Sequence, residues 1–109
     1  MIFEVTQWQA ARPIVWETTV EAIIPRIRGV KSFRFPKPEG FQYRAGQWMY
    51  INIKIGGVQK LHHFTISSSP TEGYLEFTKK ITDSPYSQAL DKMKPGDWAK
   101  INAPSASSP

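Results

Sequence analysis

The chain has 109 residues and a formal net charge of +5, and this length predicts a single domain. It contains no cysteine, which excludes disulfides, iron–sulfur ligation and thiol chemistry within this sequence. Hydrophobic residues make up 40% of the chain, no apolar run is long enough to span a bilayer, and the first residues lack the features of a signal peptide, so we expect a cytoplasmic protein.

Alternation of apolar and polar residues predicts β-strands along most of the chain. The clearest case is residues 48–55, in which every second position is a methionine or an isoleucine. In the first predicted strand, the same alternation would place Val20, Ala22 and Ile24 on one face. The six predicted strands are residues 18–24, 30–35, 48–55, 61–68, 74–81 and 98–103.

These strands predict an all-β fold. Gly56 and Gly57 predict a tight hairpin turn, because glycine reaches positive φ without a Cβ clash. Six short strands would leave long unpaired edges in a flat sheet, so we expect a closed, six-stranded antiparallel Greek-key barrel. Residues 84–93 break the alternation, with Ser84 as a capping residue and Pro85 at the first helical position. We therefore expect one short helix between the fifth and sixth strands.

The most informative stretch is residues 62–70, His-His-Phe-Thr-Ile-Ser-Ser-Ser-Pro. A strand that only filled a core would alternate strictly, whereas this segment is polar along most of its length. We therefore expect its side chains to face something polar and flat, such as a bound cofactor. A metal site at His62 and His63 is not expected, because adjacent strand residues point to opposite faces and no third ligand is spaced nearby.

The same segment carries a resemblance to a known family. The chain resembles the flavin-binding barrel of the ferredoxin–NADP⁺ reductase superfamily, whose fourth strand has an Arg-x-Tyr-Ser type motif followed by small residues and a proline. His62 stands at the arginine, Phe64 at the tyrosine and Thr65 at the serine. The Ala-Gly-Gln-Trp run at 45–48 and the Lys-Pro-Gly-Asp run at 94–97 are similar to two further family motifs.

The resemblance implies roles for individual residues. Phe64 would stack on the flavin ring, and the hydroxyl of Thr65 would bond flavin N5, the atom that accepts hydride in this family. The main chain of residues 62–67 would bind the ring and ribityl edge, and the helix start would hold phosphate. The predicted cofactor-binding residues are His62, Phe64, Thr65, Ile66, Ser67, Lys79, Lys80 and Ser87, with Thr65 also predicted to be catalytic.

The resemblance also implies the cofactor and the reaction. We expect FAD, with FMN left open, because His62 replaces a permanently charged, bidentate phosphate binder. A His-x-Phe-Thr version of the motif occurs in the family's ferric reductases and NADPH oxidases. Hydride would pass from NAD(P)H to the flavin, and single electrons onward to an acceptor such as an iron–sulfur protein.

The resemblance covers about residues 18–104. Residues 1–17 are interpreted as a lead-in, and residues 105–109 as a linker towards a nicotinamide-binding domain, for which this sequence has no Gly-rich loop. We therefore expect the domain alone to bind flavin but to be reduced by NAD(P)H slowly or not at all.

Two alternatives stay open. A small basic barrel can bind single-stranded nucleic acid through exposed aromatic residues, although residues 67–70 and the helix would then have no role. The residues that would form such a face are Trp48, Tyr50, Lys54, Lys60 and Arg34. The other alternative is a flavin-free scaffold or regulatory domain.

Overall fold

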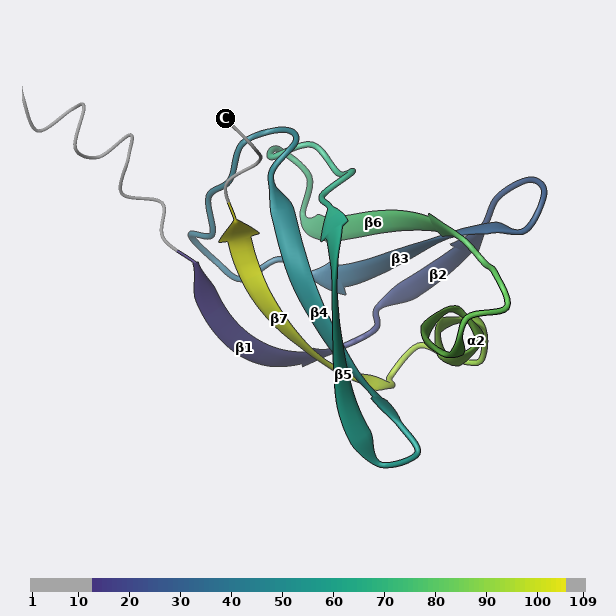
Figure 1. The fold of residues 1–109 in the computed structure, drawn as a ribbon. Helices are drawn as coiled ribbons and strands as arrows, with labels where there is room; N and C mark the ends of the chain where they lie inside the picture. Colours follow the sequence, from purple (N-terminus) through teal and green to yellow (C-terminus); the bar gives the residue numbers. More distant parts are fainter. Residues whose placement is uncertain (1–12, 106–109) are drawn as a thin grey trace, which may run out of the picture.

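The structure, a computed structural model, describes residues 13–105. These residues form a four-stranded and a three-stranded antiparallel sheet with one short helix beside them (Figure 1). In chain order, the elements are β1 (Ile14–Thr19), β2 (Ala22–Pro25), β3 (Val30–Pro36), β4 (Trp48–Ile55), β5 (Val58–Thr65), β6 (Tyr74–Lys80), α2 (Pro85–Asp91) and β7 (Trp98–Ser105). The strand order is β1-β7-β4-β5 in the first sheet and β2-β3-β6 in the second.

The predominance of strands and the single short helix are confirmed for residues 13–105, but the six-stranded closed barrel is wrong. Over this part of the chain there are seven strands in two sheets. The extra strand arises because the predicted strand 18–24 is divided at Val20. The Val20 N–H donates to the Asp97 carbonyl at 2.9 Å, and the next N–H, of Glu21, donates to the Arg34 carbonyl at 2.7 Å. The chain therefore leaves the four-stranded sheet and enters the three-stranded sheet at this point.

The corner at Val20 also changes which residues face the core. We expected Ala22 and Ile24 to share the inner face with Val20, and this is wrong. Ile23 lies opposite Phe33 in the strand register and packs against the core. Because the alternation restarts after the corner, Ala22 and Ile24 lie on the outer face of the three-stranded sheet.

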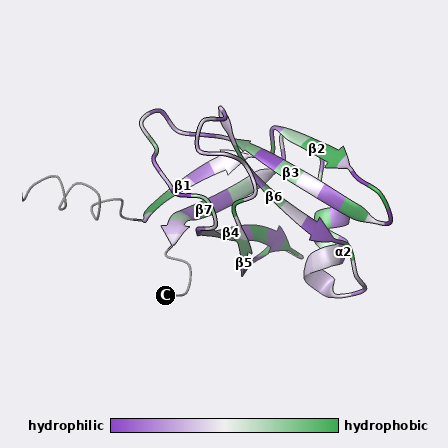
Figure 2. Ribbon diagram, turned by 90° about the horizontal axis from the view of Figure 1, so that it is seen from above, coloured by the Kyte–Doolittle hydropathy of each residue, from purple (hydrophilic) through white to green (hydrophobic). Residues whose placement is uncertain are grey.

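The hydrophobic core lies between the two sheets. Phe77 is at its centre, with ring centroids 5.0 Å from Phe33 and 6.1 Å from Phe35. Figure 2 shows the two sheets from above, with hydrophobic and hydrophilic bands alternating along β3. The largest fully buried side chains of the strands are Phe33, Phe35, Met49, Ile51, Ile53, Leu75, Phe77 and Ile101. Each fully buried side chain of this size contributes about 1.5–3 kcal/mol, so this core, rather than surface ion pairs, holds the sheets together.

The hairpin and the helix agree with the sequence. Gly56 and Gly57, with φ of 59° and 81°, form the two-residue turn between β4 and β5, and Ile55 pairs with Val58. Strand β5 begins and ends three residues earlier than the predicted strand 61–68. Helix α2 is capped by Ser84, whose side chain accepts a hydrogen bond from the Ser87 N–H.

Candidate functional site

The candidate site lies where the edge strands of the two sheets meet. Strand β5 ends the order of the four-stranded sheet, and β6 ends that of the three-stranded sheet. The end of β5 lies beside the start of β6 (Figure 1). Just beyond β5, the Ser67 N–H donates to the Glu76 carbonyl of β6 at 2.8 Å. Strand β5 pairs with β4 along its other side, so its free side faces β6 and α2.

His62 and Phe64 share the inner face of β5, since they are two residues apart in a strand. Phe64 stacks on Phe77 of β6, with ring centroids 4.1 Å apart and an interplanar angle of 13°. His62 stacks on Tyr86 of α2 at 3.9 Å and 25°. The structure therefore brings these two predicted residues together in an aromatic wall built from β5, β6 and α2.

Thr65 is exposed on the opposite face of β5, at the last residue of the strand. It pairs with Trp48, whose ring stacks on His63 at 4.7 Å. Phe64 and Thr65 were predicted to contact the same ring, and their side chains lie on different faces of the strand. A ligand that touches both must therefore lie across the end of β5.

The next two predicted residues differ in exposure, since Ile66 is buried and Ser67 is exposed. The Ile66 side chain is buried in the core, and its N–H donates to the Gln47 carbonyl at 2.8 Å. The Ser67 hydroxyl donates to both the main-chain and the side-chain oxygens of Glu76, at 3.2 and 3.1 Å. What Ile66 offers a ligand is thus its main chain.

The two lysines predicted to bind phosphate lie on different faces of β6. Lys79 lies on the inner face of β6 with Phe77, and Lys80 lies on the outer face, because neighbouring strand residues alternate. Lys79 is opposite Lys31 in the register, and Lys31 forms an ion pair with Asp91 of α2 at 2.7 Å. Lys79 is therefore the lysine on the helix side.

Ser87 lies at the first turn of α2 and is fully buried. Its hydroxyl accepts a hydrogen bond from the Thr82 hydroxyl at 3.1 Å, and its N–H donates to Ser84 at 3.2 Å. Both groups thus stabilise the start of the helix. A phosphate would reach the Ser87 hydroxyl only by displacing Thr82.

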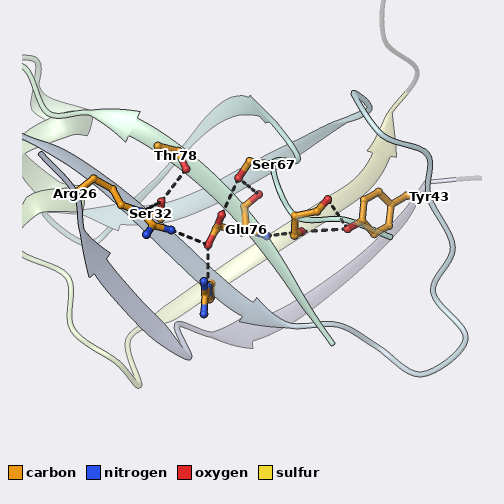
Figure 3. A network of polar contacts seen from close by, with 8 residues as sticks. Arg26, Ser32, Tyr43, Ser67, Glu76 and Thr78 are labelled. Atoms are coloured by element: carbon orange, nitrogen blue, oxygen red, sulfur yellow. Dashed lines mark hydrogen bonds and ion pairs between the residues drawn. The ribbon is translucent and has the colours of Figure 1, made fainter. Parts of the chain in front are cut away.

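Sequence reasoning missed Glu76, a buried carboxylate in the middle of β6. Its Oε2 accepts a hydrogen bond from Arg34 Nε at 2.8 Å and lies 3.6 Å from a terminal guanidinium nitrogen of Arg26. Its Oε1 accepts from Ser67 (Figure 3). The bond to Glu76 raises the pKa of the Arg34 guanidinium. The only signal in the sequence was an acidic residue in a strand that ends in two lysines.

A second set of contacts holds the segment that follows Ser67. The Tyr43 hydroxyl donates to the Ser68 carbonyl at 2.8 Å and lies 3.1 Å from the Ser68 hydroxyl oxygen. The same hydroxyl oxygen accepts from the Glu76 N–H at 3.0 Å. Burial raises the pKa of Tyr43. Residues 67 and 68 are thus fixed from both sides.

A cavity of about 610 Å³ opens elsewhere, between α2, the end of β4 and the start of β7. Ile53, Met93 and Trp98 supply apolar surface to it, and none of the predicted cofactor residues lines it. Over residues 13–105, no three His, Cys, Asp or Glu side chains are grouped so that they could hold a metal ion. Within the same range, no helix has the length and apolar character needed to cross a membrane.

The chain is similar to oxidases over part of its length. It is 43% identical to dual oxidase 1 of Rattus norvegicus over 47 residues, which are 43% of this chain and 3% of that protein. It is 29% identical to respiratory burst oxidase homolog protein A of Arabidopsis thaliana over 79 residues, which are 72% of this chain and 7% of that protein. The chain thus spans a small fraction of these relatives.

Solved structures share the fold. A ferredoxin NADP⁺ reductase from Neisseria gonorrhoeae with bound FAD and NADP matches with a TM-score of 0.73 and 20% identity, over 81% of this chain and 36% of that one. A flavohemoglobin from Malassezia yamatoensis matches with a TM-score of 0.76 and 14% identity, over 97% of this chain and 30% of that one. A family model described as oxidoreductase FAD-binding domain matches residues 20–108. The chain therefore belongs to the oxidoreductase FAD-binding domain family, which confirms the resemblance to ferredoxin–NADP⁺ reductases drawn from its sequence.

Proposed function

We propose that this chain binds FAD along the free side of β5 and forms the flavin-binding part of an NAD(P)H-dependent electron-transfer oxidoreductase. The observation that carries the proposal is the aromatic wall, in which His62 and Phe64 lie side by side on β5 against Tyr86 and Phe77. A flat, largely apolar ring with a polar edge matches such a wall beside exposed hydroxyls.

The residues at the end of β5 fit the flavin ring. One face of the Phe64 ring is covered by Phe77, and the other would stack on the ring system. Thr65 is exposed at the last position of the strand, where its hydroxyl would donate a hydrogen bond to flavin N5. The main chain of residues 62–67 would bind the ring and ribityl edge. FAD, once bound, supplies the hydride and single-electron chemistry.

The phosphates would lie towards the helix. His62 and Lys79 are on the inner side, near α2, and would be the first residues to meet a pyrophosphate. Lys80 lies on the far face of β6, so its contribution would be a longer-range attraction. Ser87 would contribute only if the phosphate displaced Thr82 from its hydroxyl. The match to an FAD-binding domain family favours FAD over FMN.

The rest of the reaction requires parts outside this sequence. A nicotinamide-binding domain would follow the predicted linker at residues 105–109, of which Ser105 ends β7 and residues 106–109 lie outside the described residues. Of the predicted lead-in at residues 1–17, residues 14–17 are in β1, so we count them with the flavin domain predicted at 18–104, and residues 1–12 lie outside the described residues. The acceptor is unspecified, and an iron–sulfur protein is one class that fits. The cytoplasmic location stays a prediction.

An absorption spectrum tests the proposal. The purified chain is mixed with FAD or with FMN, excess flavin is removed by gel filtration, and the visible spectrum and flavin fluorescence are recorded. We expect retained flavin bands, quenched fluorescence and a preference for FAD. A chain that remains colourless with both flavins would overturn the proposal.

Two further measurements separate the alternatives. Reduction of the bound flavin by NADH or NADPH should be slow, and rapid saturable reduction would contradict the need for a second domain. A colourless chain that binds oligonucleotides with a steep salt dependence would support the nucleic-acid alternative. The residues suggested for that face are divided in the structure, since Trp48 and Lys54 lie on β4 whereas Arg34 lies on β3.

A further inference from the structure

We infer that Glu76 is a positioning residue that fixes the end of β5 for flavin binding. This inference rests on the proposed function. Glu76 is on β6 and would itself touch no flavin in the proposed arrangement. Its role would be to hold Ser67 and, through the main chain, Thr65.

Glu76 makes four hydrogen bonds to Ser67 and Ser68, which lie in the loop after β5. The Glu76 carbonyl accepts from the Ser67 N–H at 2.8 Å and from the Ser67 hydroxyl at 3.2 Å. The Glu76 Oε1 accepts from the same hydroxyl at 3.1 Å, and the Glu76 N–H donates to the Ser68 hydroxyl at 3.0 Å. Main chain and side chain of Glu76 thus act together on residues 67 and 68 (Figure 3).

Two arginines set the direction of the carboxylate. Arg34 and Arg26 both approach Oε2, which leaves Oε1 for Ser67. The Arg34 guanidinium is itself placed over the Tyr74 ring, 4.1 Å from the centroid. Hydrogen bonds to a charged carboxylate are stronger than those between neutral groups, and a buried charge without its partners is costly. The ionised glutamate therefore holds Ser67 more firmly than a neutral side chain would.

The position of this attachment matters for Thr65. Strand β5 is bonded to β4 up to Thr65, and the chain then crosses to β6 at Ser67. Two residues of extended chain span about 7 Å, and the Ile66 N–H between them donates to the Gln47 carbonyl at 2.8 Å. This bond and the attachment at Ser67 together fix the strand end at the point where a flavin ring would lie. Loosening it would change the direction of the Thr65 hydroxyl while the aromatic wall stayed in place.

The test uses E76Q, with E17Q as the matched control. Glu17 is an exposed glutamate on β1 that accepts a hydrogen bond from the Trp98 indole at 2.6 Å, so its replacement makes the same chemical change away from β5. FAD dissociation constants are measured by fluorescence quenching, on variants whose folding is checked by circular dichroism. We expect E76Q to weaken FAD binding about tenfold and E17Q to change it less than twofold.

A double-mutant cycle separates positioning from general loss of stability. If Glu76 acts through Ser67, the variant E76Q/S67A should lose no more affinity than the more damaging single variant. Losses that multiply would overturn the inference. S67A leaves the carboxylate and its arginines intact, so it also serves if E76Q fails to fold: S67A should then weaken FAD binding several-fold, and unchanged binding by S67A would overturn the inference.

Two readouts do not depend on affinity. In the flavin-free chain, the Ser67 amide hydrogen should exchange faster in E76Q than in E17Q. At saturating FAD, the visible bands of bound flavin should shift in E76Q, whereas a merely structural role would leave them as in the wild type. If E76Q folds and has the affinity and spectrum of the wild type, this inference is overturned and the proposed function is not. A wild-type chain that binds no flavin would overturn the proposed function and this inference with it.

Discussion

His62 lies flat against Tyr86, with ring centroids 3.9 Å apart. Tyr86 is fixed in turn, because its hydroxyl donates to the Ile51 carbonyl at 2.7 Å and its side chain is buried. The pair therefore joins β5 to α2 through a contact between two rings. The family's arginine would have a permanent charge at this position.

Replacement of His62 by arginine tests whether this position faces phosphate. H62R restores a permanent charge with bidentate geometry, so we expect FAD to bind at least about fivefold more tightly at low salt. The gain should shrink as ionic strength rises. H63R is the control, because His63 is on the opposite face beside Trp48. Equal gains in both variants would show that general surface charge, and not this position, attracts the cofactor.

The second prediction concerns stability at high pH. Burial raises the pKa of Tyr86 above its usual value of 10.0. A raised folded-state pKa contributes stability that is fully present below the unfolded pKa and is lost as pH rises towards the folded pKa. The free energy of unfolding should therefore fall above about pH 10, by at most about 1.4 kcal/mol per pH unit from this group. Urea unfolding from pH 8 to 11 measures it.

Y86F provides the comparison for this pH dependence. The variant should be less stable near neutral pH, since the Ile51 carbonyl loses its hydrogen bond. It should also have a shallower decline above pH 10. A decline as steep as in the wild type would assign the effect to other groups.

The third prediction separates the two contacts of Phe64. F64L keeps an apolar side chain against Phe77, so the flavin-free chain should lose less than about 1.5 kcal/mol of stability. The ring-on-ring contact with flavin is lost, and FAD should bind about two- to tenfold more weakly. Thermal unfolding and FAD titration measure the two effects. If F64L greatly lowers the stability but leaves the affinity for FAD unchanged, Phe64 contributes to the core and does not contact the flavin.

Lys79 and Lys80 give a fourth prediction, because they are adjacent in sequence and lie on different faces of β6. K79A should weaken FAD binding several-fold, because Lys79 is on the side of α2. The affinity of K79A should also depend less on salt concentration than that of the wild type. K80A carries the same charge change and should have a smaller effect. Titrations of both variants with FAD at two salt concentrations measure the difference. A larger effect of K80A would indicate that the phosphate binds on the outer face of β6.

The fifth prediction concerns the hydroxyl of Thr65. T65V preserves the shape of an exposed side chain, so the stability should change by less than about 0.5 kcal/mol. Loss of a donor to N5 should slow flavin reduction by NAD(P)H about tenfold or more in the protein that carries the nicotinamide-binding domain. Stopped-flow bleaching of the flavin measures the rate. T19V, another exposed threonine of the same sheet, should leave the rate unchanged.

The strands in the middle of the chain could be predicted because their alternation is strict. In residues 48–55, Met49, Ile51 and Ile53 are buried, and Gly56-Gly57 favours a tight hairpin turn. The first predicted strand failed because alternation along it cannot reveal a change of sheet. The division at Val20 depends on hydrogen bonds to Asp97 and Arg34, which are distant in sequence.

The candidate site was predictable only where a local pattern carried it. The motif at residues 62–65 located the aromatic wall, since spacing by two places His62 and Phe64 on one face. It did not identify Tyr86 as the partner of His62, or Glu76 as the partner of Ser67. Those contacts join β5 to α2 and β6, and nothing in either local sequence records the other.

Strand β5 is an edge strand of its sheet, and this has a consequence for the solubility of the protein. Over residues 13–105, β5 pairs with β4 along one edge, and its other edge has no strand partner. Two copies of a protein can pair through such exposed edge strands and aggregate. A flavin bound along β5 would cover that edge. We therefore expect bound flavin to reduce aggregation of the chain.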